Sequence, residues 1–408
     1  MAETKPEFLS LASAGKLMPQ EEMLEVRKQK KSVSIGVPVE ISFQENRIAL
    51  VPEAVGLLVQ NGHQVMIESG AGKAAHFPDN EFSEQGALIV STAEEVFKAD
   101  VILKVAPPVD SEINMMKNRQ TLISALHLTV QKQDFFKKLI AKKITAVSYE
   151  LIKDKTKSFP VVRAMSEIAG NTSILIAAEY LSDPVYGKGS MLGGFSGITP
   201  TEVVILGAGT VGEFAARAAM GLGALVKVFD NSLYKLRRLQ NNLNTRIFTS
   251  IVQPKVLLKS LKTANVVIAA LHTTEGRSPI VVTEEMVSEM KEGSVIIDVS
   301  IDQGGCVETS RVTNHSDPVF QVHGVTHYCV PNIASKVSHT ASYALSNFFA
   351  PILLDLGEEG GIENKLKNDY GVRQGVYLYN GILTNKFIGE YYGMPYQDIE
   401  LLMAAFQH

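Results

Sequence analysis

Cysteine is scarce in this chain, which has only Cys306 and Cys329 among 408 residues. Two cysteines cannot form the set of disulfides that stabilises a small secreted domain. Both are therefore expected to be packed thiols in a reducing compartment, and we expect a cytoplasmic protein. Neither cysteine belongs to a Cys-x-x-Cys pair or to the Cys/His spacing of a zinc site, so no metal is expected.

Long apolar runs and an excess of basic residues are also missing. No stretch of about 18 uncharged apolar residues occurs, so no transmembrane helix is expected. The N-terminus lacks the charged segment and apolar core of a secretory signal peptide. Lys and Arg number 39 against 43 Asp and Glu, which gives a net charge of −4. This balance argues against nucleic acid or an anionic membrane as the main partner.

What the chain does contain is a glycine-rich turn near its centre. The apolar run 203–206 leads into Gly207-Ala208-Gly209-Thr210-Val211-Gly212, and an alanine-rich amphipathic stretch follows at 213–222. A strand, a GxGxxG turn and a helix in this order are typical of a dinucleotide-binding Rossmann unit. The glycines allow a tight turn, close approach to the pyrophosphate and close packing of the helix, whose N-terminus favours phosphate. Gly207, Gly209, Thr210, Val211 and Gly212 are accordingly predicted to bind the cofactor.

An acidic residue, Asp230, ends the next apolar strand, eighteen residues after Gly212. Its carboxylate can accept hydrogen bonds from the ribose hydroxyls and would repel a 2′-phosphate, so the expected cofactor is NAD rather than NADP. The alternative interpretation of Asp230 is an exposed loop aspartate. Lys235 lies nearby in the sequence and could weaken the preference for NAD.

The length and the hydrophobic content of 45% allow two full cores. Residues 1–31 are polar and are expected to form an extension or a docking helix. Strands are expected at 33–37, 64–68, 101–105, 121–125 and 145–148, and then at 203–206, 225–229, 266–271, 295–301 and 328–330. An apolar helix at 341–354, interrupted at Pro351, and a charged tail follow, and this last segment is expected to fold back onto the first half.

These elements predict an α/β fold with two doubly wound Rossmann-like domains. The NAD-binding domain, residues 161–338, would be inserted in a discontinuous substrate domain, residues 32–160 and 339–408. A ligand cleft is then expected at the carboxyl ends of the strands. Four segments end such strands: 44–47, 103–108, 124–128 and 298–306. Leu271, which ends the strand expected at 266–271, is also assigned to cofactor binding.

In these segments the chain resembles the alanine dehydrogenase family, which shares its fold with the nucleotide-binding domain of proton-translocating transhydrogenases. The resemblance runs from about residue 33 to the C-terminus. It is carried by Ile35-Gly36-Val37-Pro38, Glu45-Asn46-Arg47, Pro52, Glu68-Ser69-Gly70-Ala71-Gly72, Leu126-His127-Leu128, Met165-Ser166-Glu167-Ile168-Ala169-Gly170, the Gly207 turn, Ile301-Asp302-Gln303-Gly304-Gly305-Cys306 and Tyr328-Cys329-Val330-Pro331-Asn332. It implies the reversible oxidative deamination of L-alanine to pyruvate and ammonia with NAD, and a homo-hexamer.

Three side chains suit this chemistry by their type. The guanidinium of Arg47 can clamp a substrate carboxylate in a bidentate manner, although a surface ion pair with Glu45 is the alternative. His127 can exchange a proton with a carbonyl oxygen, although a lone strand-end histidine is more often structural. Asp302 can activate the water that attacks the imine, or can merely cap its loop.

On the cofactor side the resemblance implies contacts from Ser166 to the pyrophosphate, from Asp230 and Lys235 to the adenosine ribose region, and from Asn332 near the nicotinamide. Hydride passes directly between substrate and cofactor, so no metal is needed.

One departure concerns the segment 103–108. The family usually has Lys-x-Lys-Glu-Pro there, and its second lysine helps to bind the substrate, but this chain has Ala106 at that position. Lys104 matches the first lysine and would face the same side of the strand, so it is the candidate replacement for substrate binding. Arg163 is a second possible source of positive charge.

The residues also leave room for different functions. Ala106 is compatible with a transhydrogenase nucleotide-binding subunit, but His127 and Asp302 match the dehydrogenase pattern, and the segment 231–266 is too short for the mobile loop of transhydrogenases. A dehydrogenase for another small amino acid, including a lysine-pathway relative of the saccharopine type, fits the same motifs. So does an NAD-binding regulator without turnover.

Overall fold

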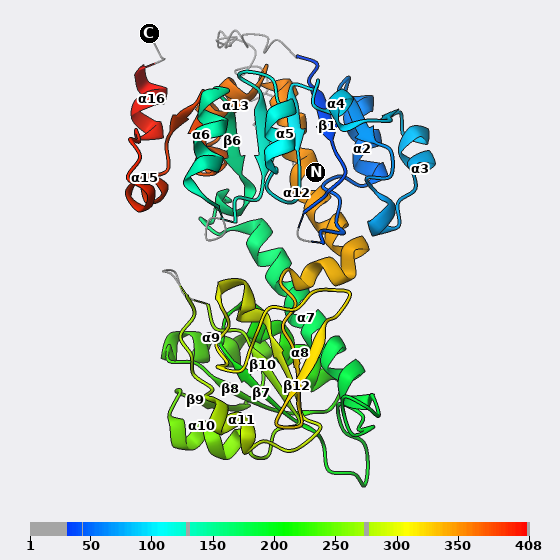
Figure 1. Ribbon diagram of the computed structural model, residues 1–408, viewed down its shortest axis with the longest axis vertical. Coiled ribbons are helices and arrows are strands. Elements are labelled where there is room, and N and C mark those ends of the chain that lie inside the picture. The colour runs from blue at the N-terminus through cyan, green and yellow to red at the C-terminus, as the bar shows by residue number, and fades with distance from the viewer. Residues whose placement is uncertain (1–30, 43, 128–130, 273–276, 406–408) are drawn as a thin grey trace, which may run out of the picture.

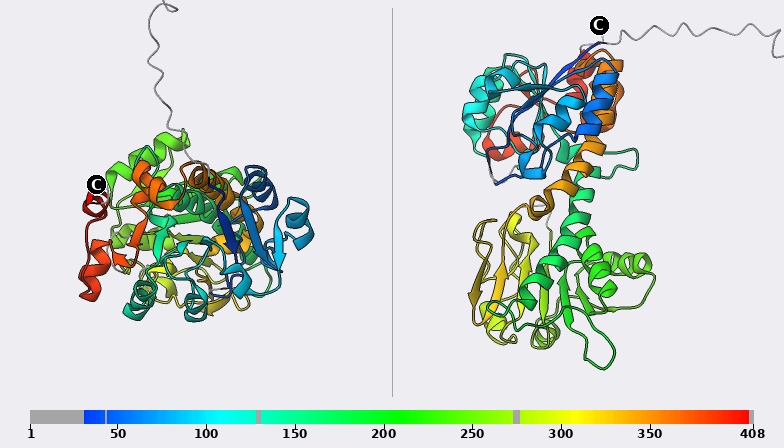
Figure 2. Two further views of the ribbon diagram at one scale, coloured as in Figure 1. Left: turned by 90° about the horizontal axis from the view of Figure 1, so that it is seen from above. Right: turned by 90° about the vertical axis from the view of Figure 1, so that its right-hand side faces the viewer.

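The computed structural model describes residues 31–42, 44–127, 131–272 and 277–405. Nearly all of the expected N-terminal extension, and Leu128 of the 124–128 segment, lie outside these ranges. Two α/β lobes follow one another along the long axis of the molecule (Figure 1). Two long helices run between them, α7 (Pro160–Ser182) and α12 (Ser338–Glu358), and the side view shows both at the junction (Figure 2).

The sheet of the first lobe has eight strands in the order β15-β14-β6-β5-β4-β1-β2-β3. They are β1 (Ser34–Val37), β2 (Gln64–Glu68), β3 (Leu88–Val90), β4 (Val101–Leu103), β5 (Thr121–Ser124), β6 (Thr145–Ser148), β14 (Val376–Tyr379) and β15 (Ile382–Leu383). Strands β1 to β6 are parallel, and β14 and β15 are added in antiparallel pairings. The strand order reverses between β1 and β4, and α/β sheets bind ligands at such a point.

The sheet of the second lobe has seven strands in the order β12-β13-β11-β10-β7-β8-β9. They are β7 (Glu202–Leu206), β8 (Leu225–Phe229), β9 (Phe248–Ser250), β10 (Val266–Ala269), β11 (Val295–Asp298), β12 (Val319–Val322) and β13 (Val325–Tyr328). All pairings are parallel except that of β12 with β13. Here the order reverses between β7 and β10, so the glycine-rich turn after β7 lies at the expected ligand position.

Helices cover both sheets (Figure 1). Those of the first lobe are α2 (Pro52–Gln60), α3 (Asp79–Glu84), α4 (Ala93–Val96), α5 (Asp110–Met115), α6 (Gln133–Ala141), α13 (Ile362–Asn368), α14 (Tyr370–Arg373), α15 (Lys386–Tyr392) and α16 (Ile399–Ala405). Those of the second lobe are α8 (Thr210–Gly221), α9 (Leu233–Leu243), α10 (Pro254–Leu261) and α11 (Glu284–Ser288). Four 3₁₀ helices are η1 (Lys73–Ala75), η2 (Tyr149–Leu151), η3 (Val299–Gln303) and η4 (Ile333–Val337). Across the described ranges, no helix combines the length and apolar character that a membrane span needs.

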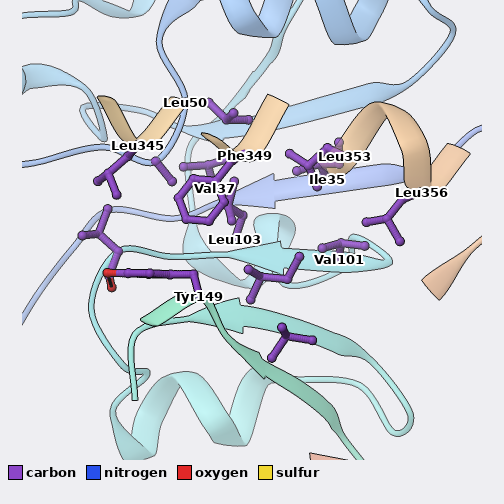
Figure 3. Close-up of a cluster of buried hydrophobic side chains, with 14 of the residues drawn as sticks. Ile35, Val37, Leu50, Val101, Leu103, Tyr149, Leu345, Phe349, Leu353 and Leu356 are labelled. Carbon is purple, nitrogen blue, oxygen red and sulfur yellow. Dashed lines mark hydrogen bonds between the residues drawn. The ribbon is translucent and has the colours of Figure 1, made fainter. Parts of the chain in front are cut away.

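The helix α12 packs its apolar face into the core of the first lobe. Leu345, Phe349, Leu353 and Leu356 lie against the side chains of β1 and β4 (Figure 3). The expected interruption at Pro351 is wrong, because α12 is continuous from residue 338 to 358. Proline removes one helix hydrogen bond, but Pro351 is exposed, and so is the residue one turn earlier whose carbonyl loses its partner. Water can therefore satisfy that carbonyl while the opposite face stays buried.

The structure confirms the expected α/β fold with two Rossmann-like sheets, and corrects several element boundaries. The strand expected at 295–301 ends at Asp298 and continues as the 3₁₀ helix η3. The strand expected at 328–330 is β13, which ends at Tyr328. The segment described as a charged tail contains β14, whose four residues are all buried and which pairs with β6.

Candidate active site

The glycine-rich turn has the geometry that its glycines allow. Gly207 has a φ of 111°, and a Cβ there would overlap the carbonyl oxygen of Ala270. A Cβ on Gly212 would overlap the carbonyl oxygen of Gly207, because α8 begins directly against the end of β7. A Cβ on Gly209, by contrast, would meet nothing within 4 Å. Gly207 and Gly212 thus serve packing, while Gly209 leaves open space beside the backbone, which suits a closely approaching pyrophosphate.

We expect Gly212→Ala to weaken NAD binding. The added methyl group must push the first turn of α8 away from β7, a repacking that costs about 1–3 kcal/mol. Calorimetric titration with NAD should show a dissociation constant raised by roughly tenfold or more. Gly221→Ala is the matched control, because Gly221 ends the same helix and its added Cβ would meet nothing within 4 Å. Equal NAD affinity in both variants would contradict the assignment.

Asp230 is buried, whereas the alternative interpretation expected an exposed loop aspartate. Its Oδ2 accepts a hydrogen bond from the backbone N–H of Ala208 at 2.8 Å, and its Oδ1 accepts from Ser232 N–H at 2.7 Å. The carboxylate therefore ties the end of β8 to the glycine-rich turn. Each carboxylate oxygen has a further lone pair, so hydrogen bonds from ribose hydroxyls remain possible.

Other predicted cofactor residues surround this turn. A Cβ on Gly170 of α7 would lie 2.5 Å from the carbonyl oxygen of Val211, so α7 packs directly on the start of α8. Ser166 is half-buried on α7, one turn before Gly170. Lys235 is half-buried in the first turn of α9, and its charge lowers the pKa of His272, after burial as the main cause. The carbonyl oxygen of Leu271 accepts a hydrogen bond from Ser300 Oγ at 2.8 Å.

Arg47 lies in the loop after β1 and is held by Glu45. Glu45 Oε1 accepts from Arg47 Nε at 2.7 Å, and Oε2 accepts from Nη2 at 2.6 Å. Arg47 and Glu45 are each only 6% exposed. Their ion pair is therefore buried, whereas the alternative interpretation placed it on the surface. Nη1 lies 3.2 Å from the sulfur of Met165 on α7. The bidentate edge is thus occupied by Glu45, and a substrate carboxylate would meet the Nη1 side.

Lys104 does not supply a free positive charge. Its side chain is fully buried, and Nζ lies 2.7 Å from Glu112 Oε1 and 3.0 Å from Glu40 Oε2. Glu40 also accepts from the backbone N–H of Val105 at 2.5 Å. Burial raises the pKa of Glu40 to about 6 although the charge of Lys104 opposes the shift. Glu40 and Glu112 thus already pair with the ammonium group of Lys104, and a substrate carboxylate would have to share it with them.

Arg163 is not a better source of the positive charge that is missing at Ala106. It lies on an exposed part of α7, where its Nε is 3.0 Å from Glu167 Oε1 in an i,i+4 pair. Such exposed pairs are weak, and the guanidinium remains on the surface.

His127 follows β5 in a left-handed backbone conformation, with a φ of 45°. Its N–H and that of Leu126 donate to Glu150 Oε2 at 3.2 and 2.7 Å. The imidazole Nε2 lies 3.9 Å from Glu150 Oε1. Glu150 thus fixes the loop that carries His127 and places a carboxylate beside the ring. Sequence reasoning missed Glu150, although it lies two residues after an expected strand, 145–148, on the same sheet edge.

Asp302 lies on η3, at the carboxyl end of β11, where it remains accessible to solvent although neighbouring protein atoms partly desolvate its carboxyl group. Its Oδ1 accepts from the backbone N–H of Asn332 at 3.1 Å. Nearby protein raises the pKa of Asp302 by desolvation, whereas the Asn332 hydrogen bond and the charges of His127 and Arg47 lower it. Hydrogen bonds through Glu45 and Asn332 connect Arg47 of the first lobe to Asp302 of the second. The imidazole of His127 acts on the same carboxyl group.

Asn332 joins the two lobes within this site. Its side-chain Nδ2 donates to Glu45 Oε2 at 2.7 Å. This hydrogen bond connects a residue of the second lobe to one of the first lobe. Within the described ranges, no cluster of three or more His, Cys, Asp or Glu side chains is arranged to hold a metal ion. The arrangement offers a guanidinium, an imidazole and a carboxyl group, which suits proton transfer to or from a small substrate.

Comparisons with known proteins agree with this geometry. Residues 36–169 match the model of the alanine dehydrogenase/PNT N-terminal domain, and residues 173–386 match that of the C-terminal domain. An alanine dehydrogenase of Methanococcus maripaludis is 39% identical over 368 residues, which cover 90% of this chain and 98% of that protein. One of Mycolicibacterium smegmatis is 36% identical and covers 91% of this chain and 100% of that protein.

Solved structures give the same result. An L-alanine dehydrogenase superposes with a TM-score of 0.83 at 36% identity, covering 88% of this chain and 99% of the other. A transhydrogenase from Sinorhizobium meliloti has a TM-score of 0.73 at 22% identity, covering 87% and 99%, and this likeness shows a shared fold alone.

Proposed function

This chain belongs to the alanine dehydrogenase/PNT family, and we propose that it catalyses the reversible oxidative deamination of L-alanine to pyruvate and ammonia with NAD. The observation that carries the proposal is the convergence of Arg47, His127 and Asp302. Arg47 is connected to Asp302 of the opposite lobe by hydrogen bonds through Glu45 and Asn332, and the His127 imidazole contributes to the electrostatics of the same carboxyl group. The relatives named alanine dehydrogenase, which match almost the whole chain, support the same reaction.

NAD, when bound, accepts the hydride from the substrate Cα. The residues proposed to hold it are Ser166, Gly207, Gly209, Thr210, Val211, Gly212, Asp230, Lys235, Leu271 and Asn332. The open space at Gly209 and the free N–H groups at the start of α8 suit a pyrophosphate. The buried carboxylate of Asp230 favours ribose hydroxyls and would oppose the 2′-phosphate of NADP. Residues 161–338 would form the NAD-binding domain, and residues 32–160 and 339–408 the substrate domain.

Arg47 is proposed to bind the substrate carboxylate. Its guanidinium already pairs with Glu45, but Nη1 contacts the weakly accepting sulfur of Met165 and can donate to an incoming carboxylate instead. Because Lys104 is neutralised and Ala106 carries no charge, Arg47 is the cation that this part of the site offers. A single cation binds the substrate carboxylate more weakly than two cations would. The fit of the substrate side chain then contributes a larger share of the specificity.

His127 and Asp302 are proposed to move protons. Asp302 takes a proton from the water that attacks the imine carbon, and its raised pKa suits a base. Asp302 then returns this proton to the nitrogen of the carbinolamine, and His127 takes the proton of the hydroxyl group as the carbonyl forms and ammonia leaves. In the reverse direction the imidazolium donates to the carbonyl oxygen of pyruvate. Glu150 stabilises the imidazolium through its nearby carboxylate.

The test is a steady-state assay of the full-length protein with NAD and a panel of small L-amino acids, followed by NADH absorbance. L-Alanine should give the highest kcat/KM, and NADP should replace NAD poorly. A higher kcat/KM for another amino acid would change the substrate. If no amino acid reduces NAD, and pyruvate with ammonium does not oxidise NADH, while calorimetry still detects NAD binding, the chain is a nucleotide-binding regulator. A homo-hexamer, proposed by family resemblance, is checked by light scattering.

A further inference from the structure

The carboxylate of Glu45 collects an unusual number of hydrogen bonds. It accepts from Arg47 N at 2.9 Å, Arg47 Nε at 2.7 Å, Arg47 Nη2 at 2.6 Å, Asn332 Nδ2 at 2.7 Å and Ser335 Oγ at 3.2 Å. Its side chain is 1% exposed. Burial alone would raise its pKa, but the charge and hydrogen bonds of Arg47, with that of Asn332, hold the pKa at about 2. Glu45 is therefore ionised throughout the physiological range.

These donors come from both lobes. Glu45 and Arg47 belong to the loop that follows β1 in the first sheet. Asn332 and Ser335 lie at the start of η4, which follows β13 in the second sheet, so the carboxylate joins the two lobes. The neighbouring backbone strengthens the junction, since Asn46 N–H donates to Ser335 Oγ at 2.8 Å. Arg47 cannot keep its orientation if the Asn332 side of this cluster moves.

Asn332 connects the same cluster to Asp302. Its backbone has a φ of 56°, a conformation that asparagine tolerates better than most residues. In that conformation its N–H reaches Asp302 Oδ1 while its side chain reaches Glu45 Oε2. A continuous set of hydrogen bonds thus runs from Arg47 through Glu45 and Asn332 to Asp302.

We propose that Glu45 is a positioning residue that couples the nucleotide site to the substrate-carboxylate site. This inference rests on the proposed function, in which Asn332 lies near the nicotinamide and Arg47 binds the substrate. Ordering of Asn332 by the nucleotide fixes Glu45, which pre-orients the Arg47 guanidinium. The substrate then binds with a smaller ordering cost, and by linkage it tightens nucleotide binding by the same factor.

The test measures this factor directly. NADH is titrated by fluorescence in the absence and presence of saturating pyruvate, without ammonium so that amination cannot proceed. For the unmodified protein pyruvate should lower the dissociation constant of NADH by roughly 5-fold or more, in the usual range of coupling factors. Glu45→Gln keeps the shape but replaces one acceptor oxygen by an NH₂ group that faces other donors. It should reduce the factor to within about twofold of unity while both ligands still bind separately.

Glu53→Gln is the matched control, since Glu53 is an exposed carboxylate whose partner is the hydroxyl of Tyr343. It should keep the full coupling. If Glu45→Gln does not fold, Asn332→Gly removes the interdomain side-chain donor at a position whose backbone N–H is also bonded to Asp302 and whose φ suits glycine, and it should also abolish coupling. Equal coupling in the variants and the unmodified protein, or no coupling in an unmodified protein that turns over alanine, overturns the inference. Absence of turnover in the unmodified protein would instead count against the proposed function.

Discussion

Asp302→Asn is expected to lower kcat for alanine oxidation by roughly 10²- to 10⁴-fold, the usual contribution of a positioned general base. The amide oxygen can still accept from Asn332 N–H, as Asp302 Oδ1 does at 3.1 Å, so the loop should keep its position. What the variant loses is the ability to take a proton from water. NAD affinity, measured by calorimetry, should therefore change by less than about threefold.

The pH profile provides a second readout for Asp302. Desolvation raises its pKa, so the group stays protonated to a higher pH than an ordinary aspartate. Because the base must be deprotonated, kcat should fall as the pH decreases through this raised pKa. Asp302→Asn should remove that acidic limb. Asp317→Asn, in an exposed loop, should preserve both the rate and the profile. A kcat of Asp302→Asn near that of the control would exclude Asp302 as the base.

Much of the fold could be predicted because its main signals are local. The glycine-rich turn, the strand before it and Asp230 after it lie within 28 residues, positions 203–230, and their spacing is set by backbone geometry. Two of the strands that were not predicted carry weaker signals. β3 and β9 have three residues each at sheet edges. β14, by contrast, has the clear strand pattern Val-Tyr-Leu-Tyr followed by an Asn-Gly turn, and sequence reasoning overlooked it. The continuity of α12 through Pro351 depends on which face is buried, and that is a tertiary property.

The sequence indicated several residues of the candidate site but not the contacts that they make. Strand ends directed attention to His127 and Asp302, because polar residues at the carboxyl edge of a parallel sheet converge, while Arg47 lies in the longer loop after β1. The ion pairs of Lys104 were not predictable, since its partners Glu40 and Glu112 come from a loop before β4 and a helix after it. Nor could the sequence show that Glu45, two residues from Arg47, also reaches Asn332, 287 positions away. Local spacing predicts which groups are near the site, and tertiary packing decides which charges remain available.

His127→Asn is expected to reduce kcat in both directions by roughly 10²-fold or more. Asparagine tolerates the left-handed backbone of this position, where φ is 45°, so the hydrogen bonds from residues 126 and 127 to Glu150 should persist. The substitution therefore keeps the loop and removes the imidazole that is proposed to move the proton. Stopped-flow and steady-state assays of alanine oxidation and pyruvate amination would measure the loss.

The chain offers a matched control for this prediction. His323 also has a left-handed backbone, with a φ of 51°, and its Nε2 lies 3.0 Å from Glu284 Oε1 on the outer part of the second lobe. His323→Asn therefore repeats the backbone conformation and the loss of a carboxylate-paired imidazole at a position away from Arg47 and Asp302. It should leave kcat within about twofold of the unmodified protein. If both variants keep full turnover, the imidazole of His127 serves its loop alone, and the acid–base work must be done by another group beside Asp302.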